Sequence, residues 1–107
     1  MTENLNGRVA ASPEEIAHVD RLMSNLFGGL VKVHLTGGSN IVGLVSILDR
    51  AKVGSGILAT VTLTTIAHEA VILNLLAIES AESAFVEYRS AFAAAGLLDL
   101  GGINTAH

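Results

Sequence analysis

The feature that most constrains the fold is a change in the spacing of apolar residues on either side of Gly28-Gly29. Before the two glycines, apolar side chains recur at the spacing of one helix face, at Ile16, Val19, Met23 and Leu26. After them, residues 30–36 alternate between apolar and polar side chains, which is typical of a strand with one solvated face. The sequence therefore predicts a helix that joins a strand through a pair of glycines.

The start of this helix has a local signal of its own. Ser12 is a suitable N-cap, Pro13 occupies the first helical position, and Glu15 stands where a capping box requires an acidic side chain. We therefore predict an N-terminal helix at residues 13–27. Residues 1–11 are small and polar without periodicity, and we expect them to form a flexible arm.

The middle of the chain is rich in β-branched and other apolar residues and predicts three strands. Gly43 lies inside the second of them, where a glycine marks a bend, a bulge or a close backbone contact. The segments, in order, are a strand at 30–36, a turn at 37–40, a strand at 41–48, a loop at 49–56 and a strand at 57–65.

The region that follows allows two interpretations. In the first, residues 66–69 form a hairpin turn, residues 70–75 form a fourth strand, and residues near 77–80 form a short fifth strand. In the second, residues 67–95 form one long helix, which the abundance of Ala, Leu and Glu favours. We favour the strands, because three strands alone would leave long unpaired edges.

Both interpretations end in a C-terminal helix at about 81–95. Gly96 follows it as a suitable C-cap. Residues 97–107 contain a further pair of glycines, and we expect them to form a flexible tail. The sequence thus predicts a single domain at residues 12–96. The apolar stripe of the C-terminal helix consists of Phe85, Tyr88, Phe92 and Ala95.

The segment 30–49 resembles the first motif of the Sm-like proteins, in which alternating apolar residues precede a glycine-containing turn and a bent strand with an internal glycine. Gly37 stands where the family usually has Asp. The resemblance implies a mostly β fold with flanking helices: an Sm-like (SH3-type) small five-stranded barrel with an N-terminal helix at 13–27 and a C-terminal helix at about 81–95. The residues that carry it are Val31, Val33, Leu35, Gly37-Gly38, Ile41, Gly43 and Leu48-Asp49.

Sm-like proteins that bind RNA place an aromatic or apolar residue and an Asn shortly after the Asp of this motif, and a basic element in a second motif. Here residues 50–54 contain neither an aromatic residue nor an Asn, and residues 73–78 contain no basic residue. The formal net charge of −4 also opposes RNA binding, because positive charge supplies most of the affinity for phosphates. RNA binding of the chaperone type is therefore the alternative function, and we expect no DNA partner. The candidate RNA contacts are Lys32, His34, Asp49, Arg50 and Lys52.

The residue types offer little for metal or covalent chemistry. The chain has no cysteine, and its four histidines are isolated from one another, so we predict no metal site and no cofactor. Ser39, His34 and Asp49 have the residue types of a hydrolase triad, but no nucleophile-elbow motif surrounds the serine. We therefore expect a protein that is not an enzyme, and a small enzyme is the last alternative.

The composition favours association with other chains. Half of the residues are apolar and only 15% are charged, which indicates more apolar surface than a lone monomer exposes. We expect a non-catalytic binding module that forms a homo-oligomer, with another protein as an additional partner. The apolar stretch 70–78 is too short to span a bilayer and the N-terminus lacks a signal-peptide pattern, so we expect a cytoplasmic protein without a membrane partner.

Overall fold

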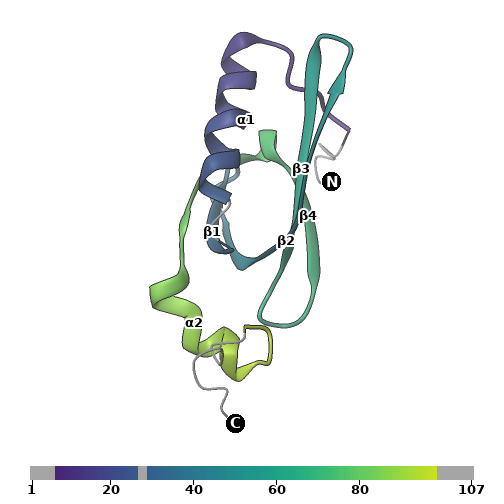
Figure 1. Cartoon of the computed structure of the whole chain (residues 1–107). Coiled ribbons are helices and arrows are strands. Elements are labelled where there is room, and N and C mark those ends of the chain that lie inside the picture. The colour runs from purple at the N-terminus through teal and green to yellow at the C-terminus, as the bar shows by residue number, and fades with distance from the viewer. Residues whose placement is uncertain (1–6, 27–28, 99–107) are drawn as a thin grey trace.

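The computed structural model describes residues 7–26 and 29–98. In this part of the chain, a five-stranded antiparallel sheet is flanked by an N-terminal and a C-terminal helix (Figure 1), so the prediction of a mostly β fold with flanking helices is confirmed. The elements are α1 (Pro13–Asn25), β1 (Leu30–Leu35), β2 (Asn40–Val53), β3 (Gly56–Thr64), β4 (Ala70–Asn74), the 3₁₀ helix η2 (Leu75–Ala77), β5 (Ile78–Ser83) and α2 (Phe85–Ala94).

The strands lie in the order β4-β3-β2-β1-β5, and each neighbouring pair is antiparallel. The sheet is curled, so that β5 lies on one side of the core and β3 and β4 lie on the other (Figure 1). Within the described residues β4 and β5 do not pair with each other, because η2 turns the chain away between them. The five strands therefore form an open, curled sheet where we expected a barrel.

The start of α1 agrees with the prediction. The Ser12 Oγ accepts a hydrogen bond from the Glu15 N–H at 3.1 Å, and the Glu15 Oε1 accepts one from the Ser12 N–H at 3.4 Å, so the capping box forms. The helix ends at Asn25 with Leu26 as its C-cap, before the predicted end at residue 27, which lies outside the described residues.

The glycine inside β2 has the role that its position indicates. A Cβ on Gly43 would lie 3.0 Å from the Leu63 Cβ and 3.0 Å from the Thr64 carbonyl oxygen, so glycine allows β2 to pass close to β3. A β-bulge follows between Val45 and Ile47 and increases the local twist. Both features help β2 to curve around the core.

The predicted loop at residues 49–56 is wrong. β2 continues through Val53, and only Gly54 and Ser55 connect it to β3. Gly54 has a φ of +63°, in the left-handed region that tight hairpin turns require. The polar residues that suggested a loop are accommodated because this end of the hairpin is largely exposed to solvent.

The strand interpretation of residues 70–80 is correct. β4 pairs with β3, and β5 pairs with β1. The C-terminal helix begins at Phe85 rather than near residue 81, because residues 81–83 extend β5 along β1. Pairing with β1 satisfies the backbone of these residues and overrides their helix propensity.

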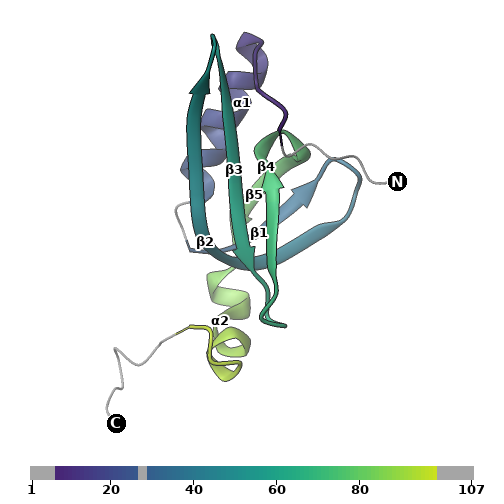
Figure 2. The ribbon, with the colours of Figure 1, turned by 90° about the vertical axis from the view of Figure 1, so that its right-hand side faces the viewer.

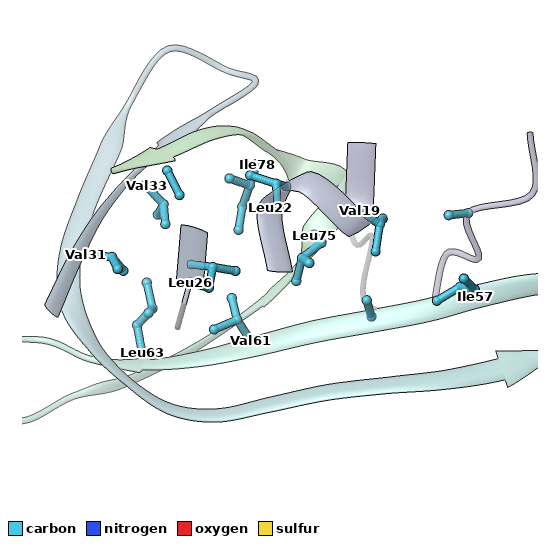
Figure 3. Packing of buried hydrophobic residues seen from close by; sticks show 13 residues of the cluster. Val19, Leu22, Leu26, Val31, Val33, Ile57, Val61, Leu63, Leu75 and Ile78 are labelled. Atoms are coloured by element: carbon cyan, nitrogen blue, oxygen red, sulfur yellow. The ribbon is translucent and has the colours of Figure 1, made fainter. Parts of the chain in front are cut away.

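The main core lies between α1 and one face of the sheet (Figure 3). From Val31 along β1 and from Ile57 along β3, the residues that face this core alternate with less buried ones, as the period of a strand requires. Burial of the α1 stripe against this face holds the helix over the curled sheet. The larger members of the cluster are Val19, Leu22, Leu26, Val31, Val33, Ile57, Val61, Leu63, Leu75 and Ile78.

α2 packs on the opposite face of the sheet and forms a second, smaller cluster. Its Phe92 is only 1% exposed and packs with Leu30 and Ala84. The C-cap of α2 is Ala95, and the predicted Gly96 follows it with a φ of +81°; the Leu97 N–H donates to the Phe92 carbonyl oxygen at 2.9 Å, so glycine ends the helix as expected, one residue later. The stripe on this helix therefore serves to attach it to the sheet.

Residues 1–6 of the expected arm and residues 99–107 of the expected tail lie outside the described residues. Ala10, near the end of the expected arm, is fully buried and exchanges two backbone hydrogen bonds with Ile57 of β3, at 2.8 and 2.9 Å. This part of the chain is therefore held against the sheet. In the described ranges, no helix has the length and apolar character needed to cross a membrane.

Candidate functional site: charged strand residues and sheet edges

Lys32 and His34 lie on β1, on the face turned away from the main core. The register places Lys32 opposite Glu82 of β5, and the His34 Nε2 lies 3.4 Å from the Glu82 Oε2. The Glu82 side chain is 61% exposed, so this contact is solvated and weak. The carboxylate nevertheless lowers the positive potential that an RNA phosphate would need here.

Arg50 and Lys52 lie on β2, and their register with β3 places them on the face turned toward the main core and α1. The Arg50 Nη2 donates to the Asp20 Oδ1 of α1 at 3.0 Å. Asp49 lies on the opposite face, because successive side chains of a strand alternate. The structure therefore distributes the five candidate RNA contacts over two faces of the sheet instead of gathering them in one patch.

The residue types of a hydrolase triad are also not assembled. His34 pairs with Asn40 beside the β1–β2 turn that contains Ser39. Asp49 pairs with Thr60 much farther along β2. In the part of the chain that the structure describes, no group of three or more His, Asp or Glu residues could hold a metal ion.

β4 forms one edge of the sheet and exposes an apolar side chain there. The Thr65 N–H donates to the Glu69 carbonyl oxygen at 2.9 Å, where the β3–β4 turn closes. Hydrogen-bonded pairs alternate along an antiparallel ladder, so Val71 and Leu73 bond to β3 and the backbone of Ile72 points away from the sheet. The Ile72 side chain is 56% exposed. At Ile72 this edge is therefore apolar, and in the part of the chain that the structure describes no further strand pairs with it.

The opposite edge of the sheet, β5, is partly covered by α1. The His18 Nε2 donates to the Ile78 carbonyl oxygen at 2.7 Å. The Asn25 Nδ2 donates to the Ala81 carbonyl oxygen at 3.2 Å. Two acceptors of this edge are thus already bonded, whereas among the described residues no helix donates to the β4 edge at Ala70 or Ile72.

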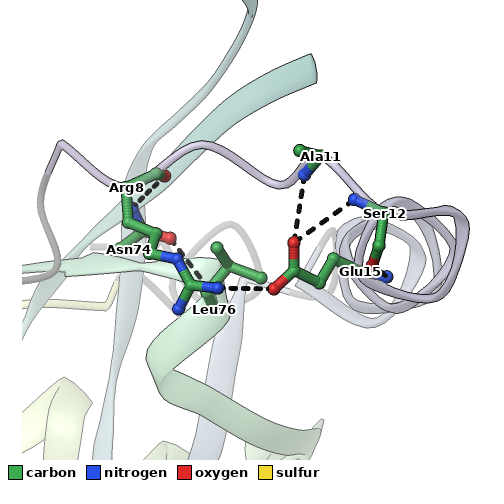
Figure 4. Close-up of polar contacts among 6 residues, drawn as sticks. All are labelled: Arg8, Ala11, Ser12, Glu15, Asn74 and Leu76. Carbon is green, nitrogen blue, oxygen red and sulfur yellow. Dashed lines mark hydrogen bonds and ion pairs between the residues drawn. The ribbon is translucent and has the colours of Figure 1, made fainter. Parts of the chain in front are cut away.

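A polar network fastens the N-terminal segment to the sheet (Figure 4). The Arg8 Nη2 lies 2.6 Å from the Glu15 Oε2, and the Ala11 N–H donates to the Glu15 Oε1 at 3.0 Å. Asn74 is only 2% exposed; its Nδ2 donates to the Arg8 carbonyl oxygen at 2.8 Å, and its Oδ1 accepts from the Leu76 N–H at 2.9 Å. Asn74 therefore caps η2 and anchors the N-terminal segment at the same time.

Glu15 is the described residue whose ionisation this network changes. The hydrogen bond from the Ala11 N–H is the largest cause that lowers the pKa of the Glu15 carboxyl, followed by the hydrogen bond from the Ser12 N–H. Desolvation opposes these two bonds by raising the pKa, and the charge of Arg8, which is the smallest cause, lowers it. The network therefore favours the ionised carboxylate, which is the form that caps the helix.

Sequence reasoning singled out charged residues and missed Asn74 and Ile72. Asn74 interrupts an apolar run, which is a signal of a cap or a turn, but its partner Arg8 is 66 positions away. Ile72 carried no signal, because an exposed edge position and a buried one look alike in an apolar run. Comparison of the chain with protein-family models, with curated proteins and with solved structures finds no match.

Proposed function

We propose that this chain is a non-catalytic interaction module of the Sm-like fold family, and that its copies associate through the edges of their sheets. The Sm-like assignment is supported by the helix that precedes the sheet and by the bend of β2 at Gly43. That glycine is the position at which the resemblance places the glycine of the bent strand. The strands that follow complete a five-stranded sheet.

The observation that carries the proposal is the apolar edge at β4. Ile72 exposes more than half of its side chain beside an N–H and a C=O that point away from the sheet. A monomeric protein normally protects such an edge with charges or covers it. The other edge, β5, has a different structure, so pairing of β4 with β5 of a second copy would be head-to-tail and would give a ring if the rotation closes. Such pairing would use backbone groups of β5 other than the Ile78 and Ala81 carbonyls, which accept from α1.

The test is the mass of the assembly in dilute solution, measured by sedimentation or light scattering for the unmodified chain and for Ile72→Lys. We expect an oligomer for the unmodified chain and a shift toward monomer for the variant, because a lysine on an edge strand opposes pairing. Val86→Lys is the matched control, since Val86 is 82% exposed but lies on α2. A strictly monomeric unmodified chain, or an oligomer that Ile72→Lys leaves intact, would contradict the proposal.

A further inference from the structure

A second stretch of strand edge lies on β2, away from the β4 edge. β1 pairs with β2 only through residues 40–44, and the Gly29 carbonyl oxygen accepts from the Val45 N–H at 2.7 Å. From residue 46 to Val53, β2 continues with β3 on one side, while no described strand lies on the other. Figure 2 shows this projecting hairpin, with the outer side of β2 uncovered by other strands.

The ladder determines which backbone groups this edge offers. Val53 pairs with Gly56 across the two-residue turn, so hydrogen-bonded pairs recur at every second residue from there. The backbones of Ala51 and Asp49 therefore face β3. The N–H and C=O groups of the residues between them, Leu48, Arg50 and Lys52, point away from β3 and toward the uncovered side.

The other side of the same hairpin is already occupied. Ala10 pairs with Ile57 and covers the edge of β3 beyond the end of β4. A Cβ on Gly56 would lie 2.5 Å from the Val9 Cγ1 and 2.7 Å from the Ala10 carbonyl oxygen, so the N-terminal segment fits tightly there. Among the described residues, β2 is therefore the strand of this hairpin to which a further strand can be added.

The two faces beside the open edge differ in chemistry. On the outer face, Ile47 is 54% exposed and Val53 is 46% exposed, with Asp49 and Ala51 between them. On the face toward α1, Arg50 and Lys52 project beside the edge, and Arg50 is paired with Asp20. Within the described residues no carboxylate lies within 4.0 Å of Lys52, so its charge is available to a partner.

We propose that the edge of β2 at residues 48–53 binds an extended segment of another protein in which acidic and apolar residues alternate, by adding that segment to the sheet as a strand. The backbone of the segment would pair with Leu48, Arg50 and Lys52. Its apolar side chains would cover Ile47 and Val53, and its acidic side chains would lie beside Lys52 on the other face. The charge on one face of this edge and the exposed apolar residues on the other thus both favour a segment in which acidic and apolar residues alternate.

A second copy of this chain is a poorer occupant of the edge. Antiparallel pairing of two β2 edges about a two-fold axis places like charges directly opposite each other in each central register. Depending on the register, the opposed pairs are Arg50 with Arg50, Asp49 with Asp49, or Arg50 with Lys52. Like charges at directly opposite positions destabilise a strand pair.

The binding test uses a short fluorescent peptide of alternating Glu and Val, with a peptide of alternating Lys and Val as its control. Anisotropy titrations at low and moderate salt should show binding of the Glu/Val peptide that weakens as salt rises, and no binding of the Lys/Val peptide. Amide hydrogen exchange should show new protection at Leu48, Arg50 and Lys52 when the Glu/Val peptide is bound. Equal binding of both peptides, or protection at Ile72 instead, would overturn the proposal.

Two substitutions of Lys52 distinguish the contribution of its side-chain charge to binding from that of its backbone N–H. Lys52→Gln should weaken binding roughly two- to five-fold, as expected for one exposed ion pair. Lys52→Pro should abolish binding, because it also removes the Lys52 N–H, which points to the partner. This substitution leaves the hydrogen bonds between β2 and β3 in place, since the Lys52 N–H is not one of their donors. Lys32→Gln makes the same change of charge on the other face of the sheet and should leave the affinity unchanged.

The same measurements can refute the assignment of the edge. Unchanged affinity in Lys52→Pro, with an unchanged circular dichroism spectrum, would show that the peptide binds elsewhere. Protection of the three outward amides without peptide, together with a mass that grows with concentration and falls in Lys52→Pro, would identify a second copy as the occupant and overturn the acidic partner. Because Ile72→Lys alters only the β4 edge, the fate of this proposal is independent of the proposed self-association.

Discussion

Substitution of Asn74 by alanine should destabilise the domain more than its position at the end of a short edge strand suggests. The side chain is 2% exposed and joins two parts of the chain that are distant in sequence. Its Nδ2 holds the Arg8 carbonyl at 2.8 Å, and its Oδ1 holds the Leu76 N–H at 2.9 Å. Alanine removes both contacts and leaves the first turn of η2 without its cap.

The size of the effect follows from the surroundings of the two partners. Loss of a capping side chain costs about 0.5–2 kcal/mol, and Leu76 is half-buried, so water replaces the lost acceptor incompletely. Loss of the second hydrogen bond costs about 0.5–1.5 kcal/mol, and Arg8 is exposed, so its carbonyl is readily hydrated. We expect a total decrease in the free energy of unfolding of about 1–3.5 kcal/mol.

Urea unfolding followed by circular dichroism measures this change. Exposed Asn40, at the start of β2, supplies the control: Asn40→Ala should change the free energy of unfolding by less than about 0.5 kcal/mol. Asn74→Asp keeps the acceptor for Leu76 but places a carboxylate oxygen beside the Arg8 carbonyl. It should therefore destabilise the domain at neutral pH and recover partly in acid, where a protonated Asp can donate. A loss below about 0.5 kcal/mol for Asn74→Ala would refute the role assigned to this residue.

Two further predictions concern the helices. Because the pKa of Glu15 is lowered below its usual 4.5, the network contributes stability above pH 4.5 and loses it as the pH falls through the lowered pKa. The difference in unfolding free energy between the unmodified chain and Glu15→Gln should therefore be largest near neutral pH and decrease in acid. A difference that does not change with pH would contradict this linkage. Phe92→Ala should lower the free energy of unfolding by about 3–5 kcal/mol, because Phe92 is 1% exposed in the cluster between α2 and the sheet. Val86→Ala, on the exposed side of α2, should leave the stability nearly unchanged. Equal effects of the two substitutions in thermal unfolding would show that α2 does not pack as described.

The best sequence predictions concern features whose causes lie within a few residues. The capping box at Ser12 and Glu15 involves positions three apart, and the helix end at Gly96 depends on the left-handed backbone that glycine adopts without strain. The alternation along β1 is equally local, because successive side chains of any strand point to opposite faces. These features are correct in the structure because no distant partner is needed to explain them.

The errors lie where a distant partner decides. Residues 49–53 have the polarity of a loop, and residues 81–83 have the propensity of a helix, but both segments pair with strands elsewhere in the chain. Backbone hydrogen bonds to β3 and β1 satisfy them, and such pairing outweighs propensities that differ by less than about 1 kcal/mol per residue. Local composition contains no record of that pairing.

The same distinction applies to the candidate site. The sequence alone identified the basic residues, but only the register shows that Lys32 and Arg50 lie on opposite faces of the sheet and that carboxylates from β5 and α1 lie beside the basic candidates. The sequence also does not distinguish Ile72, whose backbone faces the open edge, from its neighbours in the apolar run 70–73.

The helix start, the first strand, the glycine inside β2 and the mostly β character of the domain follow from the order of the residues. How far β2 extends, where β5 ends and which edges remain open depend on the folded arrangement of the strands. The physical reason is that caps, turns and side-chain alternation arise from interactions between near neighbours. An edge is open, in contrast, when no other strand pairs with it, and only the folded chain determines which strands become neighbours.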